Sequence, residues 1–414
     1  VNIKLVIKFY NSFYYCAKYF TDISILANSN QSIVVSPLLV RFSLCKVASI
    51  ASGYSRTELM TVLGINSTKM LQDCFQSLKD VIDPLKNIDV LLLNKIIVNY
   101  TDDINPNFIT NSTDYGVKVD KVGFNYPKMA VSFINRWVEK ASYKRITGVL
   151  DQTDLDNQTS IILISLAYFK VTWEFPFDIR LTKNKKFHHR DGNVSYVPMM
   201  LNTGLYLYLN DEVNNIQVGR TLKSIKIRNP LIILEFIFYY INLKLASYGL
   251  SVTFAVPQTN KGIDKFLSQL SKNQDIIRDV FKRMRFEIIN IMVPRFKIKC
   301  RIEWNKLLQK IGVTRVFNES DSGLNNVLKK DSKLKNMTLS KVKQSTFIDI
   351  DEMGIFRQTP VKGLFDVQYS QKDSILYAIA DRPFYFIIAL QADVMSHPLE
   401  IQELFTGVYY GPDK

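Results

Sequence analysis

The feature that most constrains the fold is a predominantly apolar run at residues 160–173, "SIILISLAYFKVTW". Apolar side chains that point to both faces exclude an edge strand and a strand with one solvated face. The run therefore predicts a central strand in a sheet that is covered on both sides. Such a sheet needs further layers, so the rest of the chain has to supply helices or a second sheet.

Helical patterns supply these layers. The chain predicts a helix that begins at Ser36 and Pro37, with serine as the cap and proline in the first turn, and that ends at Gly53. Other expected helices end at Gly64, begin near Pro127, and span residues 303–311 before Gly312. Further strands are expected at residues 288–299, 339–354, 382–392 and 402–410. Long strands and helices without strict alternation favour the α+β class.

Chain length and net charge limit the expected number of domains and the expected classes of partner. The 414 residues contain no linker-like stretch, so we expect a single domain over 1–414. The net charge of +15 comes from Lys and Arg spread along the chain, and the cluster at Lys183, Lys185, Lys186 and Arg190 is typical of a solvated loop. Nucleic acid is therefore not the expected partner, whereas a glycosaminoglycan or other polyanion stays a candidate.

Catalytic and metal-binding patterns are missing from the sequence. The histidines are His188, His189 and His397, and none belongs to a hydrolase or metalloprotease motif. The four cysteines show no C-x-x-C spacing and are interpreted as core residues without an implied disulfide framework; they are Cys16, Cys45, Cys74 and Cys300. We expect no enzyme activity, no cofactor and no metal site.

Glycosylation acceptors favour a secreted, extracellular protein. The Asn-x-Ser/Thr pattern occurs at Asn30, Asn66, Asn99, Asn111, Asn157, Asn193, Asn318 and Asn336. The opening "VNIKLVIKFY" is no clear signal peptide, because lysines interrupt it, and we expect the N-terminus to be incomplete. The most apolar run, residues 231–241, is too short to span a membrane and contains Glu235.

Seven motifs occur in the order typical of one family, from about residue 10 to the end. They are "SIVVSPLLV", "INRWVEKASYKRITGVL", "LAYFKVTWEFPFD", "FHHRDGNVSYVPMM", "VPRFKI…LLQKIGVTRVF", "SKVKQSTFIDIDEMG" and "ADRPFYFII". The third is similar to the signature "NAxYFKGxWxxPF", and its matching residues are Tyr168, Phe169, Lys170, Trp173, Pro176 and Phe177. Each motif is weak alone, but seven in order are specific. The chain resembles the serpin family of serine protease inhibitors.

This resemblance implies a serpin fold with a large mixed central sheet, two smaller sheets and about eight or nine helices. It implies a monomer that offers an exposed reactive-centre loop, residues 355–375, to a serine protease. In the family, the protease cleaves the loop, and the cut loop inserts as a new central strand and drags the acylated protease along. Trapping requires that insertion is faster than hydrolysis of the acyl-enzyme.

The hinge departs from the family's pattern, which reads roughly E-E/K-G-T/S-E-A-A-A-A. Glu352 and Gly354 match, but Ile355, Arg357 and Pro360 stand where small residues are usual. Strand side chains alternate faces, and the resemblance implies that Ile355 and Arg357 turn into the core on insertion. Burying Arg357 unpaired costs several kcal/mol, and Pro360 has no N–H for a central strand. A register slip by one residue would keep Arg357 out of the core, but all the remaining side chains of the inserted strand would also change faces.

The region where the sheet opens differs as well. The resemblance implies a buried polar cluster near Ser36, with Ser165 in place of the family's Asn and Gln344 in place of its His. Trp173 keeps its family position at the end of the sheet. Ser165 is short and Gln344 does not titrate, so we expect a different hydrogen-bond network.

Two peptide bonds are candidates for the one that the protease cleaves. Counting forward from Gly354 places it after Gln368, and counting back from Pro383 places it after Lys372. Lys372 suits a trypsin-like pocket with an Asp at its base.

Residues 217–241 have no counterpart in the family's pattern. The apolar run in this segment lacks the polar turn residues of a surface loop, and exposed it would favour aggregation. We interpret the segment as an atypical insertion or, preferably, as sequence read through in a gene model.

Two function hypotheses follow. The first is a working inhibitor of a trypsin-like serine protease. The second is a serpin-shaped protein that no longer traps and acts as a substrate, carrier or binding module. The hinge favours the second, through Arg357 and Pro360.

Overall fold

The fold was analysed in a computed structural model of the chain. It describes residues 31–85, 90–114, 117–170, 173, 176–210, 231–238, 248–272, 276–332, 337–352, 376–392 and 401–412. Within these residues the chain groups into two compact units, and each is described by itself. The first comprises Val34–Phe169 and Ile298–Ile348, and the second comprises Lys170–Lys297 and the chain from Asp349 onward. The single domain expected over 1–414 stays a prediction.

The described residues form eight α-helices and fourteen strands, which confirms the α+β class. The helices are α2 (Pro37–Ile50), α3 (Gly53–Leu63), α4 (Thr68–Leu85), α5 (Pro106–Asp114), α6 (Pro127–Ala141), α7 (Gly262–Lys272), α8 (Ile276–Arg283) and α9 (Asn305–Lys310). The strands are β1 (Ile33–Val35), β2 (Val90–Asn99), β3 (Lys118–Val122), β4 (Ile161–Phe169), β5 (Lys183–His188), β6 (Val194–Asn210), β7 (Leu231–Phe238), β8 (Tyr248–Pro257), β9 (Arg285–Pro294), β10 (Phe296–Glu303), β11 (Leu339–Ile350), β12 (Leu376–Ile379), β13 (Phe384–Ala392) and β14 (Ile401–Tyr409).

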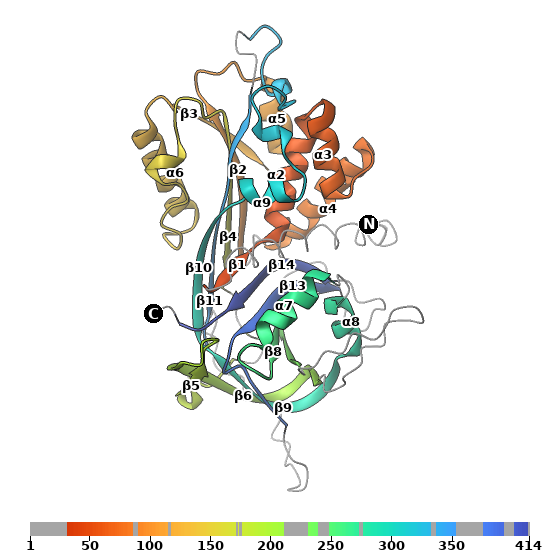
Figure 1. The fold of residues 1–414 in the computed structure, drawn as a ribbon, viewed down its shortest axis with the longest axis vertical. Helices are drawn as coiled ribbons and strands as arrows, with labels where there is room; N and C mark the ends of the chain where they lie inside the picture. Colours follow the sequence, from red (N-terminus) through yellow and green to blue (C-terminus); the bar gives the residue numbers. More distant parts are fainter. Residues whose placement is uncertain are drawn as a thin grey trace. The chain divides into compact units, whose positions relative to one another are not determined.

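The first unit is built on a five-stranded mixed sheet in the order β10-β11-β4-β2-β3. The expected central strand is β4, and all nine of its residues are buried. It pairs antiparallel with β2 and parallel with β11. Helix α6 covers one face of this sheet, and α2, α3 and α4 lie on the other (Figure 1).

Local sequence signals explain the helix ends of this unit. Gly64 follows α3 in the left-handed conformation, with φ of 65°, and closes the helix as expected. Pro37 opens α2, but the Ser36 side chain makes no cap hydrogen bond. Helix α2 ends at Ile50 rather than at Gly53, because the chain turns extended at Ala51 and Gly53 already begins α3.

The second unit contains a nine-stranded sheet in the order β1-β14-β13-β8-β7-β6-β9-β12, with β5 paired to β6 at the side. The 17-residue strand β6 pairs with β5, β7 and β9 along its length. These shared pairings join the strands of the two smaller expected sheets into one continuous hydrogen-bonded sheet. Phe266 of α7 packs on Tyr385 of β13, with ring centroids 5.6 Å apart.

Residues 231–238 require a correction to the interpretation of 217–241 as a foreign insertion or gene-model artefact. They form β7, which pairs antiparallel with both β6 and β8. A strand with a neighbour on each side is an internal part of the sheet, which also explains why its sequence lacks turn chemistry. Residues 217–230 and 239–241 lie outside the described residues.

The pattern over residues 288–299 also resolves differently from the expected single strand. It contains the end of β9 and the start of β10, separated by Arg295. Pro294 ends β9, consistent with the limited role of proline inside a strand.

Candidate functional site

The loop implied as protease bait, residues 355–375, lies outside the described residues, and so do Gly354, Ile355, Arg357, Pro360, Gln368 and Lys372. The described chain reaches Glu352 on one side of it and resumes at Leu376, the first residue of β12. The expectations for the loop therefore stay predictions. The chain that leads into it can be described, and so can the strand pair that an inserted loop would separate.

The end of β11 is fixed by backbone hydrogen bonds to the segment after β4. Nε1 of Trp173 donates to the carbonyl oxygen of Asp351 at 2.6 Å, and the N–H of Phe177 donates to that of Glu352 at 3.0 Å. Trp173 and Phe177 are buried and meet edge to face, with centroids 5.5 Å apart. Two residues of the signature motif thus hold the start of the hinge in place.

Charged groups surround the same strand end. Nζ of Lys170 lies 3.1 Å from a carboxylate oxygen of Asp351 and 3.4 Å from one of Asp349, and Nζ of Lys297 lies 3.1 Å from Asp349. Burial alone would lower the pKa of Lys170, but the hydrogen bond and charge of Asp351, followed by Asp349, raise it. The lysine stays protonated and neutralises the acidic end of β11.

Glu352, the residue that matches the family's hinge, is only 3% exposed. Its Oε2 lies 3.6 Å from Nη1 of Arg295, and its Oε1 accepts no hydrogen bond from the described residues. Among the described residues, Arg295 is therefore the ion-pair partner of the Glu352 carboxylate at the start of the hinge.

The strand pair β4–β11, called here the seam, joins residues 161–169 to 339–348, with one register shift between Leu339 and Lys341. The two strands run parallel, the geometry with slightly weaker pairing per residue, while β4 pairs antiparallel with β2 on its other side. Register partners share a face, so each face of the seam has its own set of side chains. We call them the α2 face and the α6 face after the helices that cover them.

The α2 face carries a buried network of neutral polar groups. The Gln344 amide donates to the carbonyl oxygen of Ser36 at 2.9 Å and accepts from the Ser36 N–H at 3.1 Å. Ser165, the register partner of Gln344, donates to Oδ1 of Asn94 at 2.6 Å, and its Oγ lies 3.4 Å from that of Ser43. The structure therefore brings Ser36, Ser165 and Gln344 together.

Two members of the α2-face network were missed in the sequence, Ser43 and Asn94. Asn94 had a visible signal, because it and Lys95 interrupt the apolar strand "VLLLNKIIV". Its Nδ2 donates to the carbonyl oxygen of Leu39 in α2 at 3.3 Å, so it ties β2 to the helix as well. Asn94 supplies an amide beside Ser165, which is itself too short to reach as far as the family's Asn.

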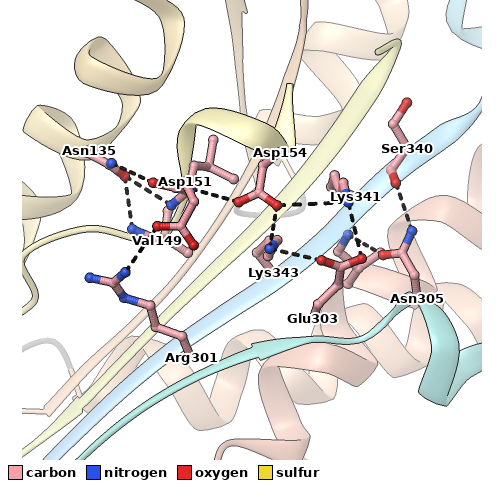
Figure 2. Close-up of polar contacts among 12 residues, drawn as sticks. Asn135, Val149, Asp151, Asp154, Arg301, Glu303, Asn305, Ser340, Lys341 and Lys343 are labelled. Atoms are coloured by element: carbon pink, nitrogen blue, oxygen red, sulfur yellow. Dashed lines mark hydrogen bonds and ion pairs between the residues drawn. The ribbon is translucent and has the colours of Figure 1, made fainter. Parts of the chain in front are cut away.

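The α6 face carries charges instead. Lys343 on β11 bridges two carboxylates, with Nζ 2.7 Å from Asp154 and 2.9 Å from Glu303 on β10 (Figure 2). Lys341 lies 3.2 Å from Glu303. Burial would lower the pKa of Lys343, but its hydrogen bonds and charge interactions with Asp154 and Glu303 raise it. We call Asp154, Glu303, Lys341 and Lys343 the ion cluster.

The ion cluster spans the seam. Asp154 belongs to the segment that connects α6 to β4, and Oδ2 of its carboxylate also accepts the N–H of Asp151 at 2.7 Å. Asn135 of α6 holds the same segment through the N–H groups of Val149 and Leu150, at 2.9 and 3.1 Å (Figure 2). The contact from Asp154 to Lys343 therefore links the α6–β4 side to β11.

The side chains that β4 contributes to the α6 face are apolar. Ile162, Ile164, Leu166 and Tyr168 of β4 pack with α6 residues such as Ile134 and Val138 in one buried cluster that also includes Phe347 of β11. Tyr168 and Phe347 stack with centroids 5.6 Å apart. Separating the two strands would break this cluster as well as the ion pairs.

The glycosylation candidates divide by exposure. Asn66, Asn111, Asn157, Asn193 and Asn318 are exposed, whereas Asn30 and Asn336 lie outside the described residues. Asn99 is 9% exposed, and its Oδ1 accepts the N–H of Phe124 at 3.3 Å. A glycan needs a side chain that reaches solvent, so we leave Asn99 out of the proposed acceptors.

Metal and membrane sites were searched within the same part of the chain. The described residues contain no group of three or more His, Cys, Asp or Glu side chains that could hold a metal ion. No described helix combines the length and the apolar character needed to cross a bilayer.

Comparison with known proteins gives a consistent result. The family model described as "Serpin (serine protease inhibitor)" matches residues 15–221 and 230–396, so it includes β7. An antitrypsin of Bombyx mori is 26% identical over 383 residues, 92% of this chain and 89% of the relative, and antichymotrypsin-2 of the same species is 25% identical over 96% of each chain.

Solved structures agree on the fold. Native protease nexin-1 with heparin superposes with a TM-score of 0.78 at 18% identity, over 98% of this chain and 100% of that one. Serpin48 of the insect Tenebrio molitor gives a TM-score of 0.76 at 22% identity, over 100% of each chain.

Proposed function

Because this chain belongs to the serpin family of serine protease inhibitors, we propose that it presents residues 355–375 to a serine protease as bait and traps that protease poorly. The family match and the relatives named after trypsin and chymotrypsin support the inhibitor class. Weak trapping rests on the hinge sequence and on the burial of the seam.

Burial on both sides of the seam is the observation that carries the proposal. Every residue of β4 is buried, and β11 is buried without interruption from Gln344 to Ile350. A strand that inserted there would have covered faces on both sides. In the register that the family resemblance implies, Arg357 would therefore enter a covered layer, and an unpaired buried guanidinium costs several kcal/mol.

Proline adds a second obstacle. An inserted strand would return from the end of β11 and would run antiparallel to both β11 and β4, with hydrogen bonds on both edges. Pro360 has no N–H to contribute, and proline is confined to edge strands and bulges. Slower insertion leaves more time for hydrolysis of the acyl-enzyme, which converts an inhibitor into a substrate.

A working inhibitor of a trypsin-like protease is the alternative function. The name of the Bombyx mori antitrypsin favours it, and Lys372 would provide the residue that a trypsin-like pocket binds. Gln368 is the other candidate for the cleaved bond and suits few proteases.

The two functions are distinguished by incubating the protein with trypsin. We expect cleavage in the loop, little SDS-stable complex, and little or no rise in Tm after cleavage. The triple variant Ile355→Thr, Arg357→Ala, Pro360→Ala should gain complex and show a large rise in Tm on cleavage. A wild-type chain whose Tm rises by tens of degrees after cleavage, a shift typical of the step from ordinary to hyperstable domains, would establish the working inhibitor instead.

The cleaved bond needs its own control, because trypsin can also cut after Arg357 and Lys362. Lys372→Ala and Lys362→Ala are matched variants within the loop. If Lys372 is the bait residue, only the first variant slows cleavage, and mass spectrometry of the released fragment shows the new terminus. Equal rates for both variants would exclude Lys372.

We further propose a secreted glycoprotein, supported by the exposed acceptors Asn66, Asn111, Asn157, Asn193 and Asn318. Expression through a secretory pathway should give a product whose mass falls on treatment with a peptide N-glycosidase. An unchanged mass would remove this support.

A polyanion such as a sulfated glycosaminoglycan is the candidate second partner. The edge strand β5 exposes Lys183, Lys185 and Lys186, and heparin accompanies protease nexin-1 in its solved structure. Exposed lysines on an edge also prevent strand pairing between molecules, which is the simpler role. If a polyanion binds there, changing all three lysines to Ala lowers the salt concentration at which the protein leaves a heparin column, whereas an unchanged position leaves only the edge role.

A further inference from the structure

Two cysteines that the sequence leaves as separate core residues meet between α2 and α4. Sγ of Cys45 lies 3.1 Å from Sγ of Cys74, and the two side chains are 0% and 1% exposed. Neither cysteine forms a disulfide bond in the structure. Because a disulfide bond is about 2.05 Å long, the two sulfur atoms need to approach by only about 1 Å to bond.

The surroundings favour reaction at Cys74. A hydrogen bond with Cys45 lowers the pKa of the Cys74 thiol to about 7, with a further contribution from the charge of Arg41 and against the effect of burial. The thiolate is the form that attacks a disulfide, and this lowered pKa applies to the packed state, in which the two sulfur atoms lie in contact. Cys300 is the opposite case, because burial raises the pKa of its thiol to about 11.

We propose that Cys45 and Cys74 form a disulfide bond that joins α2 to α4 when the chain folds with a small disulfide oxidant such as oxidised glutathione. The Cys74 thiolate attacks one sulfur of oxidised glutathione and releases one glutathione thiolate. The Cys45 thiolate then attacks the Cys74 sulfur of the mixed disulfide and releases the second. The protein loses two protons and two electrons, and the oxidant becomes two molecules of glutathione.

The bond would act on a helix that contacts the seam. Helix α2 carries Ser43, which approaches Ser165 of β4, and Leu39, whose carbonyl oxygen binds Asn94. Both sulfurs are buried, so the reaction takes place before α2 and α4 pack together or during local opening. The proposal depends on this geometry and not on the proposed function.

Peptide mapping tests the proposal on the full-length protein. The chain is refolded with reduced and oxidised glutathione, its free thiols are alkylated in denaturant, and it is digested with trypsin without reduction. We expect one linked species that joins Phe42–Lys46 to Met70–Lys79 and separates into these two peptides on reduction. Recovery of both peptides in alkylated form, or a link from either cysteine to Cys16 or Cys300, would overturn the proposal.

Stability gives a second, independent measurement. A crosslink between residues 45 and 74 should raise Tm by about 4 °C between the reduced and oxidised protein, given the length of the closed loop and the size of the chain. Cys300→Ser should keep this difference, and the double variant Cys45→Ser, Cys74→Ser should lose it. An equal redox-dependent shift in the double variant would assign the effect to other thiols.

Discussion

The two faces of the seam hold their polar side chains by different contacts. The α2 face uses neutral hydrogen bonds, and the α6 face uses ion pairs. On the α2 face, Gln344 and Ser165 are held by neutral hydrogen bonds to Ser36 and Asn94. On the α6 face, one residue away along β11, Lys343 is held by the carboxylates of Asp154 and Glu303. On the α2 face, Gln344 and Ser165 thus bind other segments, Ser36 before α2 and Asn94 of β2, whereas on the α6 face Lys343 of β11 binds directly to Asp154 of the segment that leads into β4.

The difference concerns what each face responds to. Neutral hydrogen bonds in a dry layer do not titrate and are little affected by salt, but they are costly to leave unmade. Ion pairs respond to acid, and they respond to salt to the extent that they are exposed. The contacts of the α2 face are therefore expected to respond to neither acid nor salt, and those of the α6 face are expected to respond to acid and, where they are exposed, to salt.

Gln344→Ala should have the largest effect, because it leaves the N–H and the carbonyl oxygen of Ser36 buried without the amide that binds them. We expect a loss of about 2–4 kcal/mol in the free energy of unfolding, measured by urea denaturation at pH 7. Thr346→Val on the same face is the control, since the buried Thr346 hydroxyl has no hydrogen-bond partner among the described residues. An equal loss for both variants would show that the hydrogen bonds from Gln344 to Ser36 do not account for the loss in Gln344→Ala.

Asp154→Asn should have an intermediate effect. It removes a charge 2.7 Å from Lys343, but the lysine keeps Glu303 and the amide oxygen can still accept from Asp151. We expect a loss of about 1–2 kcal/mol that shrinks at high salt, whereas the loss in Gln344→Ala should not change with salt.

Asp156→Asn is the matched control for Asp154→Asn. The carboxylate of Asp156 is exposed and accepts the Gln158 N–H at 3.0 Å, a bond that an amide oxygen retains. The same loss of stability in both variants would mean that Asp154 contributes through the hydrogen bonds of its own turn and not through its ion pair with Lys343.

Glu303→Gln should have the smallest effect, and its dependence on pH identifies the α6 face. The lysines at 343 and 341 outweigh burial and lower the pKa of Glu303 below its unfolded value of about 4.3. The carboxylate thus stabilises the fold above that pH, and the contribution disappears as pH falls through the lowered pKa. The side chain is about a third exposed, so we expect no more than about 0.5 kcal/mol at pH 7.

The check is the difference in unfolding midpoint between the wild type and Glu303→Gln from pH 7 to pH 3. It should approach zero in acid, while the difference for Gln344→Ala stays constant. A Glu303→Gln deficit that persists at pH 3 would contradict the electrostatic origin.

Much of the α2 face could be predicted from the sequence, and little of the α6 face could. The apolar run predicted β4, and the motifs placed Ser36, Ser165 and Gln344 near one another. Asn94 and Ser43 were missed because their partner Ser165 lies in another strand, 71 positions after Asn94. The lysines of "SKVKQ" look like solvated side chains in isolation, and only the path of the α6–β4 segment brings Asp154 to Lys343.

The misread segment has a related cause. An apolar run with few turn residues is ambiguous between a foreign insertion and a strand with neighbours on both sides, because periodicity cannot distinguish the two. The pairing of β7 with β6 and β8 provides the information that the run lacks. The bait loop and the hinge, by contrast, were predicted from residues that the structure does not describe.

The parallel pairing of β4 with β11 has a consequence for the order of folding. The hydrogen bond from Ser160 to Ser340 at one end of the seam joins residues 180 positions apart, whereas β2 and β4 are joined by residues 71 apart. Contacts between distant residues carry a larger loop-closure cost and form later. During synthesis and refolding, the β11-facing edge of β4 is therefore expected to remain open longer than its β2 edge. An open apolar edge accepts any strand of suitable pattern, so the yield of native protein should fall as the concentration of folding chains rises.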